Sequence, residues 1–134
     1  MADLPSLREL YSSHAGKLSD KWSLYLDAYD AVFARFRGRP VAFAEIGVQN
    51  GGSLELWAKY FPQASIVLGC DIDPKCGALA FDDPRIAVVV GNVNSDPAYR
   101  AIVARSPRYD VFIDDGSHTS RDIVMTFCSD FRHV

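Results

Sequence analysis

The chain has 134 residues, of which 49% are hydrophobic and 12% aromatic, so it can bury one sizeable core but has no room for two ordinary domains. A net charge of -3 argues against a surface that neutralises nucleic-acid phosphates, since such surfaces usually cluster Lys and Arg. The N-terminus lacks a basic start before an apolar segment, and no apolar stretch approaches the ~20 residues that cross a bilayer, which predicts a cytoplasmic protein without nucleic acid or membrane partners.

The first part of the chain has a helical pattern. In residues 19–37 the apolar side chains recur at intervals of three and four, which is typical of one face of a helix. Gly38 and Pro40 supply a stop signal for this helix. A shorter helix is predicted over residues 6–12, so residues 1–40 are assigned to an N-terminal helical segment.

After this segment, short apolar runs alternate with helical or turn patterns. The runs that predict strands are residues 41–46, 66–70, 86–90 and 111–113, and the helical or turn stretches are residues 53–60, 74–79, 97–105 and 120–131. Nearly unbroken apolar strands that alternate with helices predict a parallel sheet with helices on both faces. Residues 41–134 are therefore expected to form a Rossmann-like α/β domain.

Polar residues follow each predicted strand. They are Glu45 and Gly47, Asp71 and Asp73, Asn92, and Asp114 and Asp115. Right-handed crossovers place the C-terminal ends of all the strands along one edge of the sheet, which is where such folds bind ligands. Any one of these residues could be a turn former or a helix cap. Their occurrence after all the strands favours one shared binding crevice.

A glycine-rich turn joins the first strand to a helix and indicates a nucleoside cofactor. Twenty positions past Gly51, Asp71 ends the second strand, where its carboxylate could accept both hydroxyl protons of a ribose. In a dinucleotide fingerprint the second glycine lets the backbone approach a pyrophosphate, and here Gln49 occupies that position. NAD and FAD are therefore disfavoured, whereas S-adenosylmethionine (SAM) has no phosphate, and its ammonium suits the acidic Glu45.

Several stretches resemble the class I SAM-dependent methyltransferases, in particular the macrocin and mycinamicin sugar O-methyltransferases. The matching stretches are residues 16–22 (GKLSDKW), 45–48 (EIGV), 51–54 (GGSL), Trp57 with 60–62 (YFP), 69–72 (GCDI) and 113–118 (IDDGSH). The resemblance implies that Glu45, Gly47 and Gly51 line the methionine end of SAM and that Asp71 holds the ribose. Asn92 stands where such enzymes often place an aspartate against the adenine amino group, and its amide oxygen can accept the same bond.

Asp115 and His118 lie three residues apart from the end of the fourth strand and are the catalytic candidates. Transfer of a sulfonium methyl to a hydroxyl needs positioning and removal of the hydroxyl proton. His118 suits that task because the unperturbed pKa of histidine is about 6.5. The resemblance implies that Asp115 binds magnesium and that His118 is the general base. The alternative is a turn at Asp115 with His118 as the cap of the next helix.

Three functions fit these patterns. The first is a SAM-dependent O-methyltransferase that acts on a hydroxyl of a sugar-bearing or other small natural product. The second is a noncatalytic nucleoside-binding module, because the resemblance implies further strands after the fourth and the chain includes none. The third, an NAD-dependent oxidoreductase, lacks a recognisable hydride-transfer constellation. An uncovered edge of the fourth strand also predicts pairing with a second copy.

Overall fold

The structure is a computed structural model, and it describes residues 4–14 and 23–115. Its elements are α1 (Leu7–Ser13), α2 (Ser23–Phe33), the 3-10 helix η1 (Ala34–Phe36), β1 (Ala42–Ile46), α3 (Gly52–Tyr60), β2 (Ile66–Asp71), the 3-10 helix η2 (Pro74–Ala78), β3 (Ile86–Val90), α4 (Asp96–Arg105) and β4 (Val111–Asp114). All four predicted strands are present within one residue at each end. The helix predicted over residues 120–131 lies outside the described residues.

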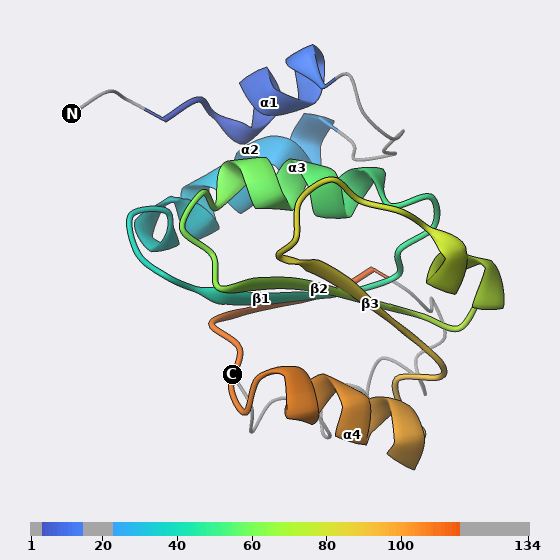
Figure 1. Cartoon of the computed structure of the whole chain (residues 1–134). Helices are drawn as coiled ribbons and strands as arrows, with labels where there is room; N and C mark the ends of the chain where they lie inside the picture. The colour runs from blue at the N-terminus through green and yellow to red at the C-terminus, as the bar shows by residue number, and fades with distance from the viewer. Residues whose placement is uncertain (1–3, 15–22, 116–134) are drawn as a thin grey trace.

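The four strands form one parallel sheet in the order β3-β2-β1-β4. Figure 1 shows α1, α2 and α3 on one face of this sheet and α4 on the opposite face. This arrangement confirms the predicted Rossmann-like α/β fold. At the start of β1, the N–H of Ala42 donates to Oδ2 of Asp110 at 2.8 Å, and the N–H of Asp110 donates to the carbonyl of Ala42 at 2.8 Å.

The two faces of the sheet bury different kinds of side chain. On the α3 face, Trp57 lies at the centre of an aromatic cluster, with its ring centroid 5.1 Å from that of Phe43 and 5.8 Å from that of Phe61. Leu7 of α1 and Leu26 of α2 belong to the same buried cluster, so the N-terminal helices share one core with the sheet. On the opposite face, mostly aliphatic residues of the sheet, among them Ala42, Ala44 and Leu68, belong to one buried cluster with Ala98 and Ile102 of α4.

Arg85 caps the C-terminal end of α3. Its Nη2 donates to the carbonyl of Ala58 at 2.8 Å, and its Nη1 donates to the carbonyl of Phe61 at 2.9 Å. The guanidinium also pairs with Asp83 at 2.6 Å. Because the last carbonyls of a helix have no partner within the helix, these bonds satisfy groups that would otherwise be left without one.

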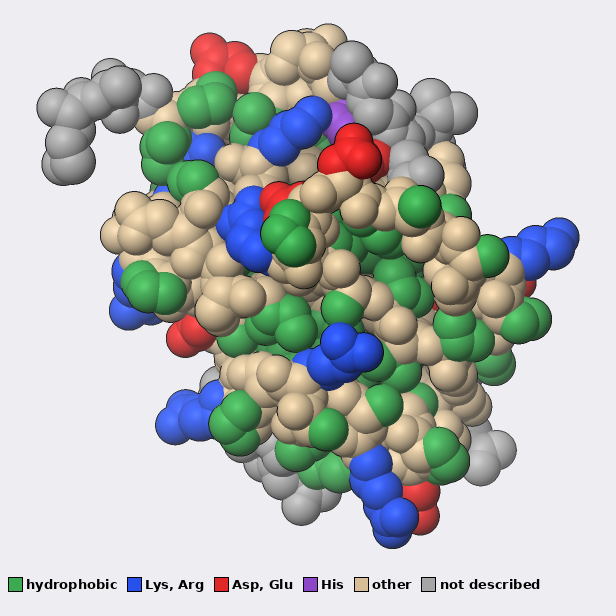
Figure 2. All heavy atoms as spheres, in the orientation of Figure 1, with side chains coloured by type: hydrophobic (Ala, Val, Ile, Leu, Met, Phe, Trp, Pro, Cys, Tyr) green, Lys and Arg blue, Asp and Glu red, His purple; other side chains and the backbone are tan. Residues whose placement is uncertain are grey.

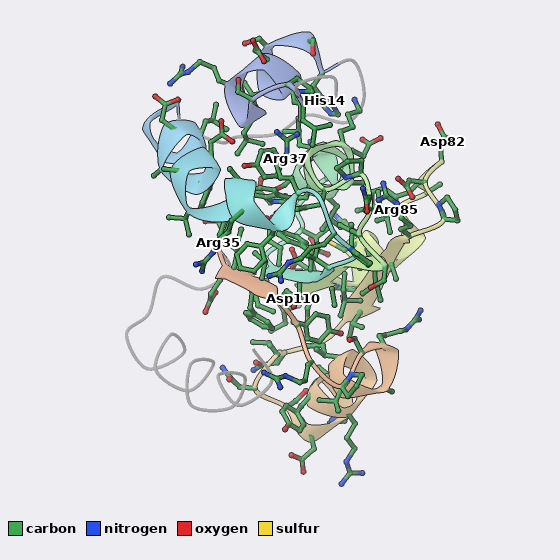
Figure 3. All side chains as sticks on the ribbon, turned by 90° about the vertical axis from the view of Figure 1, so that its left-hand side faces the viewer. His14, Arg35, Arg37, Asp82, Arg85 and Asp110 are labelled. Atoms are coloured by element: carbon green, nitrogen blue, oxygen red, sulfur yellow. The ribbon has the colours of Figure 1, made fainter. Side chains whose placement is uncertain are left out.

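Arg37 reaches the same end of α3 from the opposite side. Its Nε donates to the carbonyl of Tyr60 at 2.7 Å, its Nη1 donates to the carbonyl of Pro5 at 2.7 Å, and its guanidinium lies 3.9 Å from the centroid of the Tyr60 ring. Figure 3 shows both arginines beside α3. Arg37 therefore ties the N-terminal segment to the sheet domain.

Within residues 4–14 and 23–115, no helix has the length and apolar character needed to span a bilayer. Lys and Arg side chains are dispersed over the face shown in Figure 2, among hydrophobic and acidic ones. The absence of nucleic acid and membrane partners stays a prediction from the sequence.

Candidate functional site

The strand ends meet at one edge of the sheet, as the sequence predicts. Parallel pairing places Glu45 beside Gly69 and Ile46 beside Asp114, with Asp71 beside Val90 on the far side of β2. The pairing continues past the strands, because the N–H of Gly47 donates to the carbonyl of Cys70 at 2.8 Å. The loops after β1, β2, β3 and β4 therefore open on the same edge.

The loop between β1 and α3 has three residues with positive φ. Gly47 has φ 95°, Gly51 has φ 88° as the N-cap of α3, and Gln49 has φ 52°. Glycine adopts such angles at little cost, whereas a residue with a Cβ, such as Gln49, gives up roughly 1–2 kcal/mol in this region. The loop is therefore held in a conformation that Gln49 does not favour by itself.

Asp71 holds this loop through its carboxylate. Its Oδ2 accepts the N–H of Val48 at 2.7 Å and the N–H of Gln49 at 3.1 Å. Its Oδ1 accepts the N–H of Asp73 at 2.9 Å. Burial raises the pKa of Asp71, but these three N–H bonds and an interaction with the Cys76 thiol together outweigh the burial, so the pKa lies below its ordinary value. The carboxylate is therefore ionised at neutral pH.

The carbonyl of Gln49 is held as well. The thiol of Cys76, on η2, donates to it with a sulfur–oxygen distance of 3.3 Å. Burial raises the pKa of Cys76 to about 11, and the nearby charge of Asp71 adds to this, so the thiol keeps its proton. Sequence reasoning did not assign this role to Cys76, because a lone cysteine gives no signal of its partner.

Glu45 is buried beneath α3. It is 1% exposed, and its Oε2 accepts the hydroxyl of Ser53 at 3.0 Å and the indole N–H of Trp57 at 2.6 Å. Ser53 and Trp57 are one helical turn apart, so both side chains face the sheet. Glu45 is thus a buried acid at the start of α3, close to the glycine-rich loop that follows it.

Asn92 lies in the loop after β3. Its side chain is exposed, and its Oδ1 accepts the N–H of Asn94 at 2.9 Å. An amide oxygen has two lone pairs, so the bond to Asn94 leaves room for a second donor such as an amino group. The predicted role of Asn92 is compatible with this geometry.

Asp115 follows β4, and its N–H donates to the carbonyl of Ile46 at 2.9 Å. This bond places Asp115 beside the end of β1, at the same edge as Asp71. The other catalytic candidate, His118, lies outside the described residues. Among the residues that the structure describes, no three His, Cys, Asp or Glu side chains come together to hold a metal ion. The described residues therefore do not form a magnesium site by themselves.

Gly69 on β2 lies in the 69–72 stretch that resembles the methyltransferases, but the sequence assigned it no role, and the loop depends on it. A Cβ at this position would lie 2.6 Å from Cγ2 of Val48 and 2.7 Å from Cδ1 of Leu54. Only a glycine lets the loop and the first turn of α3 pack this closely on the sheet. An isolated glycine within an apolar strand is the signal that could have indicated this close approach.

No family model matches the chain. Similar proteins are nevertheless found by sequence. The 8-demethyl-8-alpha-L-rhamnosyl tetracenomycin-C 2'-O-methyltransferase of Streptomyces olivaceus is 36% identical over an alignment that covers 98% of this chain and 35% of that protein. Demethylmacrocin O-methyltransferase of Streptomyces fradiae is 34% identical over 97% of this chain and 34% of its own length.

The same relationship is seen in the fold. The MycE methyltransferase from the mycinamycin biosynthetic pathway, solved in complex with Mg and SAH, matches with a TM-score of 0.81 and 31% identity over 98% of this chain and 35% of that chain. Our chain thus spans about a third of the length of the relatives it matches. By sequence and by fold, the chain is similar to the macrocin and mycinamicin O-methyltransferases over about a third of their length.

Proposed function

We propose that this chain is the cofactor-binding part of a SAM-dependent O-methyltransferase that modifies a hydroxyl of a sugar-bearing or other small natural product. One observation carries the proposal. An ionised acid at the end of β2, Asp71, meets a glycine-rich loop at the end of β1, in a chain 30–36% identical to O-methyltransferases over most of its length. A cytoplasmic location is part of the same proposal.

The described residues fit SAM in their chemistry. SAM supplies an activated methyl group on a sulfonium. The loop from Gly47 to Gly51 would face the methionine end, with the buried carboxyl group of Glu45 below it. Asp71 would accept the ribose hydroxyls, since its carboxylate is ionised and only partly buried. The amide oxygen of Asn92 would accept a hydrogen bond from the adenine amino group at its second lone pair.

His118 and Asp115 would perform the chemistry at the end of β4. In this proposal His118 removes the proton of the acceptor hydroxyl, which makes the oxygen a better nucleophile. Asp115 would be one ligand of a magnesium ion, whose other ligands would come from outside the described residues. The MycE structures named above contain both Mg and SAH.

A second candidate function is a nucleoside-binding module without turnover. Both candidates predict that the chain binds the cofactor, so they differ only in catalysis. An NAD-dependent oxidoreductase is disfavoured, because Gln49 obstructs the approach of a pyrophosphate.

Cofactor binding is tested by calorimetric titration of the chain with SAH and, separately, with NADH. We expect SAH to bind and NADH not to bind. Asp71→Ala should raise the Kd for SAH by tenfold or more, because hydrogen bonds to a charged group contribute about 1.5–3 kcal/mol. Asp82→Ala is the matched control, since it removes an exposed carboxylate that lies before β3, away from the strand ends. Binding of NADH alone would overturn the proposal.

Catalysis is tested by transfer of a labelled methyl from SAM to hydroxylated sugar acceptors in the presence of magnesium. His118→Ala should lower the rate by about 100-fold while the Kd for SAH stays the same. Normal SAH binding without transfer to any acceptor would favour the noncatalytic module. An equal loss of SAH affinity in the His118 and Asp71 variants would show that their roles are assigned wrongly.

A further inference from the structure

We propose that Asp71 is also the positioning residue of the glycine-rich loop: its carboxylate holds Gln49 in the left-handed conformation and so sets the shape of the cofactor site before any cofactor binds. The part of this proposal that concerns the cofactor rests on the proposed function. The part that concerns the loop stands on the contacts of the ligand-free chain.

The contacts place Gln49 between two anchors. Its N–H donates to Oδ2 of Asp71 at 3.1 Å, and its carbonyl accepts a hydrogen bond from the Cys76 thiol at a sulfur–oxygen distance of 3.3 Å. Both anchors come from β2 and the 3-10 helix after it, and neither lies on the loop itself. Val48 adds a second N–H to the same Asp71 oxygen at 2.7 Å. The conformation of the loop is therefore imposed from the neighbouring strand.

The backbone angle explains why anchors are needed. With φ 52°, Gln49 is in a region that a residue with a Cβ rarely adopts without outside support. The two N–H bonds to a charged acceptor supply that support. The Asp71 carboxylate accepts three backbone N–H groups, from Val48, Gln49 and Asp73, and it also interacts with the Cys76 thiol.

The first test uses the ligand-free chain. We expect the amides of Val48 and Gln49 to be protected from hydrogen exchange in the wild-type chain, and Asp71→Asn to speed their exchange about tenfold. Asp73→Asn is the control, because the N–H of Asp73 still reaches Asp71 in that variant, and it should leave both rates unchanged. Rapid exchange of both amides in the wild-type chain, or equal rates in wild type and Asp71→Asn, would overturn the proposal.

The second test asks whether the loop contributes to affinity through Gln49. Gln49→Gly removes the unfavourable backbone energy, since glycine adopts positive φ freely. The change in the Kd for SAH that it causes in the wild-type background is the reference for the comparison. In the Asp71→Asn background it should recover about fivefold of the lost affinity.

A purely structural role for Asp71 would not produce this selective rescue. If Gln49→Gly restores nothing in the Asp71→Asn chain, the positioning role is wrong. The part of the affinity that stays lost in the double variant measures the ribose contact. If the wild-type chain does not bind SAH at all, the proposed function fails, and the exchange measurement still decides the role of Asp71 in the loop.

Discussion

The two ends of α3 are held by groups of opposite charge, and they serve different purposes. At the N-terminal end, Asp71 accepts hydrogen bonds from the N–H groups of the loop, and Glu45 accepts one from a side chain in the first turn of α3. At the C-terminal end, the guanidinium groups of Arg37 and Arg85 take up the last carbonyls. Both arrangements suit the helix dipole, which favours anions at the start of a helix and cations at its end.

The difference lies in what each end faces. The N-terminal end opens on the edge where the strand ends meet, whereas the C-terminal end is packed against the N-terminal segment and the start of β3. We therefore expect changes at the C-terminal end to lower stability and leave cofactor affinity intact. Changes at the N-terminal end should mainly lower affinity.

The largest effect on stability is expected in the middle of α3, between its two ends, where the helix packs against the sheet. Trp57→Ala removes a side chain that is 1% exposed at the centre of the aromatic cluster. The substitution also removes the hydrogen bond that the indole N–H donates to Glu45. The free energy of unfolding should fall by about 3–5 kcal/mol, as measured by urea denaturation. Leu4→Ala, at an exposed apolar residue, is the control and should have little effect. A loss below about 1 kcal/mol for Trp57→Ala would contradict the described core.

The C-terminal end is tested by Arg85→Met, which keeps most of the side-chain length but cannot donate to the carbonyls of Ala58 and Phe61. We expect a loss of about 2 kcal/mol in the free energy of unfolding. The Kd for SAH should stay within about twofold of the wild-type value, because Arg85 contacts the C-terminal end of α3, away from the loop at its N-terminal end. Arg100→Met, at an exposed position on α4, serves as the control. A large change in Kd would remove the distinction between the two ends.

The N-terminal end is tested by Gly51→Ala. Gly51 has φ 88°, so a Cβ there strains the start of α3. We expect about 1 kcal/mol of lost stability, together with a weaker Kd for SAH measured by calorimetry. Gly38→Ala is the matched control, because a Cβ at Gly38 meets no atom within 4 Å. If the Gly51 variant binds SAH as tightly as the wild-type chain, the loop does not shape the site.

The smallest effect is expected from pH. The pKa of Asp71 lies below its ordinary value of 3.8, so its contribution to stability is present above pH 3.8 and is lost as the pH falls through the folded-state pKa. The difference in stability between the wild-type chain and Asp71→Asn should therefore shrink as the pH falls below 3.8. Urea unfolding of the two chains over the acid range measures this difference. A difference that stays constant to the lowest pH would mean that the Asp71 charge does not hold the loop.

Much of the fold could be predicted from local patterns. The strands were identified because parallel strands buried on both faces are unbroken apolar runs, and β1 is buried at every position. The end of the long helix was less accurate, since α2 stops at Phe33 and a 3-10 turn continues to Phe36. Ahead of Gly38 and Pro40 the last turn tightens, which is common at helix ends.

The site was predicted only in part. The strand-end residues could be identified from their positions, but their contacts depend on how two loops approach in space. The bond from Asp71 to the Gln49 amide joins residues 22 positions apart, and no pattern in the sequence indicates it. The partners of Glu45 could have been predicted, since Ser53 and Trp57 are four residues apart and therefore lie on one face of the helix. The division at residue 40 also stays a prediction, although Leu7 and Leu26 share a core with Trp57.

The strand order has a consequence for how the chain folds. β1 lies between β2 and β4. On one side it pairs with β2, the next strand in the sequence, and on the other side with β4, the last described strand. The contact between Ala42 and Asp110 joins residues 68 positions apart. Closing a loop of that size costs entropy before the bonds can form, and contacts of long separation slow folding. We expect β1, β2 and β3 to assemble first and the docking of β4 to limit the folding rate.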